Sequence, residues 1–348
     1  MSKHRLKPLD FQNGRVQLSH GSGGRATAQL IDELFALHFR NDALATAHDA
    51  AVLPQAAGRW AISTDSFVVS PLFFPGGCIG DLAVHGSVND VAMAGAGPVA
   101  LTAGFILEEG FPLSDLARIV VAMARAAKTV GIPIVCGDTK VVERGKADGV
   151  FINTTCVGIV PDGVQIDPKR ACPGDVILVS GPIGEHGIAI LSLREGLSFD
   201  SDVRSDTAPL AELVSKMLQT EPDLHVLRDP TRGGVAAALH EIAEQARVDL
   251  VLDENALPIG AAVRSAAEWL GLDPLHLACE GRLLAFCPPN SADAVLQTLH
   301  AHPLGTQAVQ IGVVQSMQNN APIVELKTRL SGSRLVRWPA GEPLPRIC

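Results

Sequence analysis

Three consecutive stretches decide the fold of this chain: VALTAGFIL at residues 99–107, LSDLARIVVAMARAAKTV at residues 113–130 and IPIVC at residues 132–136. The first and the third are short apolar runs of the kind found in buried strands, whereas the middle stretch repeats apolar residues at helical spacing. A helix that connects two strands in this way forms an αβ crossover. These stretches therefore predict a domain in which helices and strands alternate.

The same alternation extends in both directions along the chain. Upstream, the pattern predicts helices at residues 28–39 and 79–94 and a strand at residues 60–69, and downstream a strand at residues 149–160. A turn-rich passage at residues 161–174 then precedes a second series of elements. In this second half we expect strands at residues 175–180, 248–252, 282–287 and 308–314, and helices at residues 186–193, 208–218, 234–245, 259–270 and 292–300.

The length of 348 residues is too great for one ordinary hydrophobic core. The sequence therefore predicts an α+β (mixed α/β) protein with two domains, residues 1–165 and residues 166–337. The tail that follows, residues 338–348, contains three prolines and a glycine, which disfavour both a helix and a central strand.

Composition and charge exclude several classes of protein. A hydrophobic content of 47% with 19% charged residues is typical of a globular protein. The net charge of −9, without any long run of Lys and Arg, gives no support for nucleic-acid binding. The longest uncharged run, residues 91–107, is shorter than a membrane helix requires, so we expect no membrane span. Seven cysteines without framework spacing argue against a disulfide scaffold, and we expect a cytoplasmic location.

The sequence ends with Pro345-Arg346-Ile347-Cys348. In an extended form, the ten residues from Pro339 to Cys348 reach roughly 30 Å, enough for the terminal thiol to enter a cleft. The alternative is an ordinary frayed terminus whose last residue happens to be cysteine. The tail alone does not separate these two interpretations.

Four aspartates stand beside small or hydroxyl-bearing residues: Asp49, Asp65, Asp90 and Asp138. Carboxylates within apolar strand patterns are costly unless they are paired or bind a metal. Mg²⁺ is often held by one or two carboxylates together with substrate phosphates. Each aspartate taken singly also fits a turn or a helix N-cap. As a set they indicate a Mg²⁺ site, because an acidic protein needs a cation to hold a polyphosphate.

Two glycine-containing turns are candidates for phosphate binding. The first precedes the predicted helix at residues 28–39 and contains Gly21, Ser22, Gly23 and Gly24. Backbone N–H groups at such a turn can bind phosphate, although a plain flexible turn has the same composition. The second is DPTRGG at residues 229–234, in which Asp229 opens the turn and Arg232 can hold a phosphate. An Asp-Pro helix start with a solvated arginine is the alternative.

Two further residues are candidates for proton transfer. Glu280 precedes a glycine at the mouth of a predicted strand, a position suited to a general base. Lys140 follows the predicted strand at residues 132–136. Both also fit ordinary exposed loop residues. The cysteines other than Cys348 lie in apolar or turn contexts and are interpreted as structural.

Nearly the whole chain resembles one known family. The segments that carry the resemblance are LSHGSGG, DAAVL, STDSFVVSP, FFPGG, GSVNDVAMAGA, CGDTKVV, DPTRGG, CEGR and the closing PRIC. They resemble the HypE family of hydrogenase maturation proteins, carbamoyl dehydratases of the aminoimidazole-ribonucleotide-synthetase-like (PurM-like) ATP-binding superfamily. GDTKVV and DPTRGG are typical of the superfamily, whereas the terminal PRIC is typical of this family.

The resemblance implies a two-domain PurM-like fold, a flexible C-terminal tail, and a homodimer formed through the N-terminal sheets. It implies that ATP binds near that interface, with Mg²⁺ and phosphates held by Asp49, Asp65, Asp90 and Asp138 and the loop from Gly21 to Gly24 closing over the nucleotide. Many members carry two successive acids where this chain has His48-Asp49. One carboxylate of the family pattern is therefore missing here.

The resemblance also implies a reaction. A partner carbamoyltransferase, HypF, loads a carbamoyl group onto Cys348, and ATP then drives its dehydration to a thiocyanate. The cyanide passes to a HypC–HypD complex that builds a nickel–iron centre. Glu280 would take protons from the carbamoyl nitrogen, and Lys140 would stabilise the activated oxygen or relay a proton. The residue types suit this chemistry, because phosphoryl transfer onto an amide oxygen creates a good leaving group.

Two other functions remain open on the sequence. A different ATP-dependent enzyme of the superfamily, one that activates an amide or transfers a phosphoryl group, would keep the aspartates and DPTRGG and leave Cys348 idle. A non-enzymatic thiol carrier would use Cys348 and leave the acidic clusters without a role.

Overall fold

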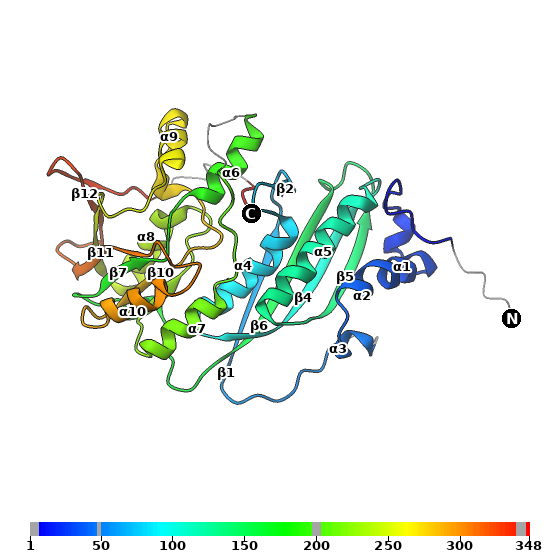
Figure 1. Ribbon diagram of the computed structural model, residues 1–348, viewed down its shortest axis with the longest axis horizontal. Coiled ribbons are helices and arrows are strands. Elements are labelled where there is room, and N and C mark those ends of the chain that lie inside the picture. The colour runs from blue at the N-terminus through cyan, green and yellow to red at the C-terminus, as the bar shows by residue number, and fades with distance from the viewer. Residues whose placement is uncertain (1–6, 47–49, 197–202, 339–345) are drawn as a thin grey trace.

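The computed structural model describes residues 7–46, 50–196, 203–338 and 346–348. Two sheets, each covered by helices, lie side by side with helix α4 (Ile79–Met93) running between them (Figure 1). A two-stranded hairpin, β2 (Phe73–Phe74) and β3 (Gly77–Cys78), precedes α4. The predicted α+β class is confirmed.

The first sheet has four strands in the order β1-β6-β4-β5. They are β1 (Arg59–Phe67), β4 (Gly97–Glu108), β5 (Ile134–Val142) and β6 (Val150–Val160). β6 is antiparallel to both of its neighbours, whereas β4 and β5 are parallel. Helix α5 (Leu113–Val130) connects the parallel pair, which is the αβ crossover expected from the sequence.

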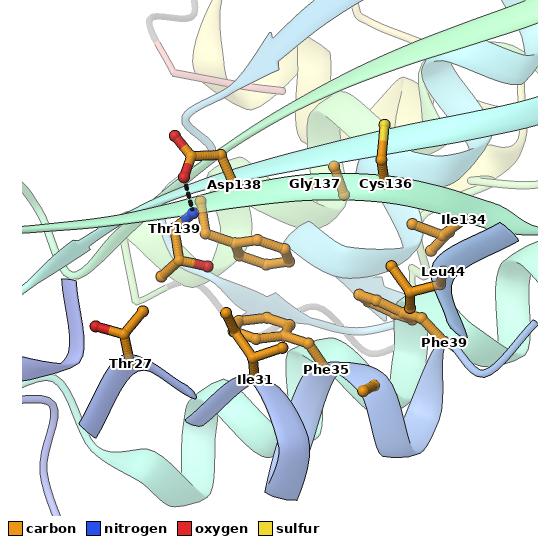
Figure 2. A pocket seen from close by; sticks show the side chains of 13 residues that line it. Thr27, Ile31, Phe35, Phe39, Leu44, Ile134, Cys136, Gly137, Asp138 and Thr139 are labelled. Carbon is orange, nitrogen blue, oxygen red and sulfur yellow. Dashed lines mark hydrogen bonds between the residues drawn. The ribbon is translucent and has the colours of Figure 1, made fainter. Parts of the chain in front are cut away.

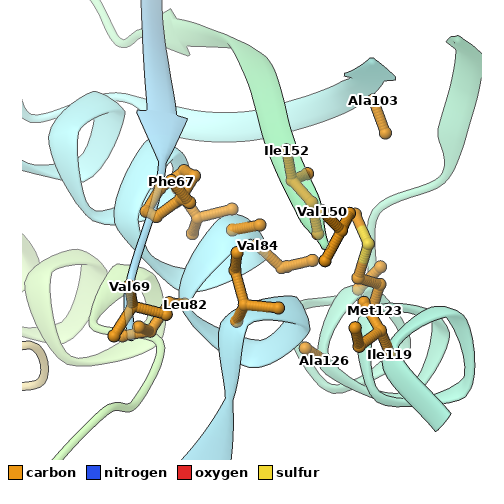
Figure 3. Close-up of a cluster of buried hydrophobic side chains, with 14 of the residues drawn as sticks. Phe67, Val69, Leu82, Val84, Ala103, Ile119, Met123, Ala126, Val150 and Ile152 are labelled. Carbon is orange, nitrogen blue, oxygen red and sulfur yellow. The ribbon is translucent and has the colours of Figure 1, made fainter. Parts of the chain in front are cut away.

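Helices cover only one face of this sheet. α4 and α5 pack against it through a cluster of buried side chains that includes Phe67, Leu82, Val84, Met123 and Ile152 (Figure 3). Exposure alternates along β1, with residues at every second position exposed. Because side chains alternate between the faces of a strand, the sheet presents a second face, here called the outer face, that no described segment covers.

Short helical segments at the N-terminal side pack near β5. They are η1 (Leu18–Gly21), α1 (Arg25–Leu30), the π-helical segment η2 (Ile31–Phe35), α2 (Ala36–His38) and α3 (Asp42–Ala45). Phe35 stacks on Phe105 of β4 with ring centroids 4.8 Å apart. A small, mostly apolar cavity of about 130 Å³ remains between these segments and the sheet.

The second sheet has seven strands in the order β13-β12-β9-β11-β7-β10-β8. They are β7 (Val176–Val179), β8 (Val226–Arg228), β9 (Val248–Asp253), β10 (Leu284–Cys287), β11 (Val309–Ser316), β12 (Val324–Lys327) and β13 (Ser333–Leu335). α8 (Gly234–Ala246) packs on one face, and α7 (Ala211–Thr220) and α10 (Ala292–His300) pack on the other. α6 (Glu185–Arg194), α9 (Ala261–Leu270), η3 (Pro168–Arg170) and η4 (Pro274–His276) complete the described elements.

Helix α4 joins the two halves because almost all of its surface is buried. Only Asp90 of its fifteen residues is not buried. Gly86 allows this packing, since a Cβ atom there would lie 2.8 Å from the Phe67 ring. A helix that is buried on every side requires partners all round, and α4 finds them in β1, β6, α5 and α7.

Two expectations about the strands require correction. β5 does not end at Cys136 but continues to Val142, so Asp138 and Lys140 lie on a strand. β8, β12 and β13 form without having been expected, because short strands within a sheet are stabilised by their neighbours more than by their own pattern. Among the described residues, no helix is long and apolar enough to span a bilayer.

Candidate active site

The last three residues of the sequence lie against the chain segment that follows β1. The backbone N–H of Val68 donates to the main-chain oxygen of Cys348 (3.3 Å), and that of Ser70 donates to the carbonyl of Arg346 (3.2 Å). Ile347 is buried, with 2% of its surface exposed, which stabilises the contact by roughly 1.5–3 kcal/mol. The terminus lies near β2, between α4 and α6 (Figure 1). Residues 346–348 are therefore docked; the expected flexibility of residues 339–345 lies outside the described residues.

The thiol of Cys348 lies beside the carboxyl group of Glu280, which the sequence indicated as a candidate base. The side chains of Cys348 and Glu280 lie close enough for each to shift the pKa of the other. The pKa of the Cys348 thiol is raised, mainly by burial and next by the charge of Glu280. The pKa of Glu280 is raised well above its usual range, mainly by burial and next by the charges of Asp229 and Asp206. Glu280 is buried, and within the described part of the chain its Oε1 has no hydrogen-bond partner. The interpretation of Glu280 as an exposed loop residue is thus wrong.

Backbone hydrogen bonds join the loop of Glu280 to the DPTRGG turn. The N–H of Cys279 donates to the carbonyl of Pro230 (3.0 Å), which places Asp229 beside Glu280. Gly234 must be glycine, because φ is +62° and a Cβ atom would lie 2.6 Å from the carbonyl oxygens of Leu275 and Leu277. Burial and the charge of Asp90 raise the pKa of Asp229 to about 7.

Asp65 and Asp90 complete this acidic group. Asp65 lies on β1 with its side chain toward α4, and Asp90 lies on α4, where it accepts a hydrogen bond from Ser63 Oγ (2.6 Å). Burial and the neighbouring Asp90 raise the pKa of Asp65 to about 6, an effect that Arg232 partly opposes. The positive charge of Arg232 also partly opposes the rise in the pKa of the Cys348 thiol. Asp65, Asp90, Asp229, Arg232, Glu280 and Cys348 thus form one cluster, here called the Cys348 niche.

Asp138 and Lys140 lie elsewhere. The register Asp65↔Thr154↔Ala103↔Gly137 places Asp138 three strands from Asp65, roughly 14 Å away at the usual strand spacing. Asp138 is one position beyond Gly137, so its side chain projects from the outer face, and Lys140 shares that face. The two residues form an ion pair of 2.8 Å with both side chains about two-thirds exposed (69% and 64%). The hydrogen bond from Lys140 lowers the pKa of Asp138.

The glycine loop lies beside the same strand. Gly21 packs so closely on β5 that a Cβ atom would lie 2.4 Å from the N atom of Val141. Gly23 has a φ of +78°, Gly24 precedes the first residue of α1, and Ser22 Oγ donates to the carbonyl of Ser19. Figure 2 shows the neighbouring cavity, with Phe35 and Ile31 on the helical side and Asp138 pointing away from them.

The described chain therefore divides the sequence-predicted residues into two groups. One group is the Cys348 niche, and the other, here called the β5 edge, contains Gly21 to Gly24, Asp138 and Lys140. Within one chain, the structure does not bring Lys140 to the Cys348 niche. Asp49 lies outside the described residues.

Sequence reasoning missed three polar residues that build the niche. Asp206 Oδ1 accepts from the N–H of Glu280 (3.0 Å), His186 Nε2 contacts the carbonyl of Ile347 (2.8 Å), and Asn89 Nδ2 donates to the carbonyl of Ala208 (3.0 Å). Asp206 and His186 belong to a loop and a predicted helix that carried no chemical signal, whereas Asn89 stands beside Asp90 in the segment GSVNDVAMAGA. Their roles arise only from contacts between distant segments.

A second group of possible metal ligands, Cys172, Asp175 and His225, has a structural explanation. Asp175 closes a turn, because its Oδ2 accepts from the N–H of Cys172 (3.0 Å) and pairs with His225 Nδ1 (2.8 Å). The sequence-based interpretation of Cys172 as structural agrees with this turn, although Cys172 itself is exposed.

Comparison with known families matches both halves of the chain. The family model of AIR synthase related protein, N-terminal domain, matches residues 47–160, and that of AIR synthase related protein, C-terminal domain, matches residues 172–325. Together with the two helix-covered sheets, these matches show that the chain belongs to the AIR synthase related proteins, the class with the PurM-like fold.

Within that class, the chain belongs to the HypE family. Carbamoyl dehydratase HypE of Cupriavidus necator is 56% identical over 98% of this chain and 97% of its own length. Among solved structures, hydrogenase maturation protein HypE in complex with ATP has a TM-score of 0.92 and 49% identity, covering 95% of this chain and 99% of that chain. HypE in a HypE–HypF complex has a TM-score of 0.78 and 47% identity, covering 89% and 99%.

Proposed function

We propose that this chain is an ATP-dependent carbamoyl dehydratase that converts an S-carbamoyl group on Cys348 into a thiocyanate for nickel–iron hydrogenase maturation. The observation that supports it most directly is the contact between the buried Glu280 carboxyl and the thiol of the docked terminus. The identity to carbamoyl dehydratases over nearly the full length supports the same activity.

The reaction needs a nucleophilic oxygen, a leaving group and a base. The carbamoyl oxygen attacks the γ-phosphorus of ATP and releases ADP, while the nitrogen loses one proton. Loss of the second N–H proton then expels phosphate, breaks the C–O bond and leaves S–C≡N. The sum is S-carbamoyl plus ATP giving thiocyanate, ADP, hydrogen phosphate and one proton, so that one of the two N–H protons ends on the phosphate and the other is released.

Glu280 is the group placed to accept these protons. Its side chain contacts Cys348 Sγ, so a carbamoyl group on that sulfur lies within its reach. A carboxylate whose pKa is raised by burial takes up a proton more readily than an exposed one. The partnerless Oε1 supplies the lone pair for this transfer.

Mg²⁺ and ATP fit the acidic side chains of the niche. Asp65, Asp90 and Asp229 lie close together, and burial, followed by the charge of Asp90, raises the pKa values of Asp65 and Asp229, an effect that Arg232 and Arg228 only partly oppose. A divalent ion relieves this repulsion and would neutralise charge on the transferred phosphoryl group. Asp65, Asp90 and Asp229 would hold it. Of the other two ligands predicted from the sequence, Asp49 lies outside the described residues, and Asp138 is too far from Asp65 to share an ion with it within one chain.

The outer face of the first sheet supports a homodimer. Trp60, Ile62 and Ile106 project from this face, and their side chains are 48%, 69% and 45% exposed. An apolar sheet face open to water is typical of a protein interface. Pairing through it would place Asp138 and Lys140 at the interface, where Lys140 can serve a nucleotide site shared by two subunits.

The other proposed partners follow from the reaction. HypF is the carbamoyl donor, and a similar chain is known in a HypE–HypF complex. A HypC–HypD complex is the proposed acceptor of cyanide. We also propose a cytoplasmic location, where thiols remain reduced.

The test is mass spectrometry of the C-terminal peptide after incubation with the carbamoyltransferase system. We expect a carbamoyl adduct on Cys348 that loses one water only when ATP is present. Cys348→Ser should form no thiocyanate, whereas the matched control Cys172→Ser, which changes an exposed cysteine elsewhere, should behave as wild type.

The remaining outcomes identify the two competing functions. ATP turnover with an unmodified Cys348 would indicate another amide-activating or phosphoryl-transfer enzyme of the class. Modification of Cys348 without any dependence on ATP would indicate a thiol carrier.

A further inference from the structure

The docked terminus is held from two sides, and only one of them is a strand-like pairing. The main-chain oxygens of Arg346 and Cys348 accept from Ser70 and Val68, and Arg346 Nε donates back to the carbonyl of Val68 (3.0 Å). The carbonyl of Ile347 is bound from the other side, by a residue of α6.

The residue that binds this carbonyl is a histidine. His186, near the start of α6, is fully buried, and its Nε2 lies 2.8 Å from the Ile347 oxygen. A carbonyl oxygen can only accept, so Nε2 carries the proton. The other ring nitrogen, Nδ1, lies 2.7 Å from Ser205 Oγ and in the neutral ring accepts from that hydroxyl.

Ser205 is itself fixed, which fixes the tautomer of His186. Ser205 Oγ accepts from the N–H of Thr207 (3.1 Å), and the N–H of Ser205 donates to the carbonyl of Pro75 (2.8 Å). The ring of Phe74 packs edge-on against the imidazole, with centroids 5.6 Å apart. Burial lowers the pKa of His186 to about 4, which agrees with a neutral ring.

The same short segment also sets the position of Glu280. Asp206, next to Ser205, accepts from the N–H of Glu280 (3.0 Å). The loops are so close that a Cβ atom at Gly281 would lie 1.8 Å from the carbonyl oxygen of Asp206. Residues 205–207 thus contact both His186, which binds the terminus, and the backbone N–H of Glu280, the proposed base.

We propose that His186 is a positioning residue for the reaction at Cys348. Its neutral imidazole, oriented by Ser205, binds the carbonyl of Ile347 and so fixes the sulfur of the next residue against Glu280. The inference deepens the proposed function and rests on it. This neutral hydrogen bond adds to the hydrogen bonds from Val68, Ser70 and Arg194 and to the ion pair between Arg346 and Asp148. All of these contacts must break before the terminus can leave for loading by the carbamoyltransferase.

The test compares His186→Leu with His186→Gln in the full-length protein. Leucine removes the donor, whereas glutamine keeps an N–H group near the position of Nε2. The first readout is the rate at which iodoacetamide alkylates Cys348 relative to the exposed Cys172 of the same molecule, measured by mass spectrometry. We expect leucine to raise this ratio about fivefold to tenfold, the effect of one lost buried hydrogen bond, and glutamine to restore most of the protection.

The second readout separates loading from dehydration. His186→Leu should load carbamoyl at the wild-type rate or faster, and should dehydrate it about fivefold to tenfold more slowly. Ser205→Ala, which leaves the histidine in place, should shift both readouts in the same direction by a smaller factor. The matched control is His300→Leu, which removes another histidine–carbonyl hydrogen bond, that of His300 to Ala308, far from the terminus.

Three results would overturn the proposal: an unchanged alkylation ratio in His186→Leu, equal defects in the leucine and glutamine variants, or an equal slowing of loading and dehydration. Failure of the proposed function looks different. In that case wild-type protein shows no ATP-dependent dehydration, while the alkylation ratio still reports on the anchor.

Discussion

The Cys348 niche and the β5 edge contain the same kinds of residues in opposite surroundings. In the niche, Asp65, Asp229 and Glu280 are crowded and at least partly buried, and their pKa values are raised. At the β5 edge, Asp138 is mostly exposed and paired with Lys140, and its pKa is lowered. The difference teaches that a motif identifies an acid, whereas its surroundings decide whether that acid holds or releases a proton.

The two regions also differ in what completes them. The niche is assembled within one chain from β1, α4, the DPTRGG turn, the Glu280 loop and the terminus. The β5 edge is open to solvent on the outer face and gains its function, in our proposal, from a second subunit and a nucleotide. Substitutions in the niche should therefore affect chemistry and pH dependence, whereas those at the outer face should affect assembly.

Removal of the base in the niche should have the largest effect. Glu280→Gln keeps the shape of the side chain but cannot accept a proton, so we expect the dehydration rate to fall about 10²- to 10⁴-fold. Loading of Cys348 should continue, and the free energy of unfolding should not decrease, because a neutral amide is easier to bury than this carboxyl group. Dehydration at the wild-type rate would remove Glu280 from the mechanism.

The buried histidine predicts a pH effect on stability. Its pKa is about 4 in the folded state and about 6.5 in the unfolded chain. The unfolded state therefore binds more protons between these values, and stability is fully present above pH 6.5 and is lost as the pH falls. By denaturant unfolding, wild type should lose about 2 kcal/mol more than His186→Gln between pH 8 and pH 5. Parallel pH profiles would contradict a neutral buried His186.

A charge on the outer face should weaken the proposed dimer. Ile62 is 69% exposed on β1, and a lysine there would have to be desolvated on pairing. We expect Ile62→Lys to raise the dimer dissociation constant at least about tenfold, equivalent to about 1.4 kcal/mol, as measured by analytical ultracentrifugation. Trp269→Lys is the control, because Trp269 is equally exposed (69%) but lies on α9. Equal effects of both substitutions would argue against this face.

The smallest effect is expected from the exposed ion pair. Lys140→Ala should change the free energy of unfolding by less than about 0.5 kcal/mol, because the pair with Asp138 is exposed to solvent. The contrasting control is Arg282→Ala. Arg282 is only 14% exposed and pairs with Glu185, so its loss should cost about 3 kcal/mol. A large loss of stability in Lys140→Ala would mean that the β5 edge is structural.

Much of the architecture could be predicted from the sequence. The helices at 79–94, 113–130 and 234–245 have clear apolar patterns, and the structure has α4, α5 and α8 at nearly those bounds. Short strands such as β8 and β13 could not be predicted, because three residues carry no periodicity and are fixed by the strands beside them. The end of β5 was wrong for a related reason: Asp138 and Lys140 break an apolar pattern, yet the outer face tolerates polar side chains.

The residues that can do the chemistry are visible in the sequence: a terminal thiol, an acid before a glycine, and aspartates in short polar motifs. The burial of Glu280, the position of Lys140 away from the niche, and the contact of His186 with the terminus emerge only in the folded chain. The physical reason is that burial and charge depend on neighbours far along the chain, as in the hydrogen bond between Arg346 and Val68. Such contacts leave no local pattern, because each partner alone has the composition of an ordinary loop or helix.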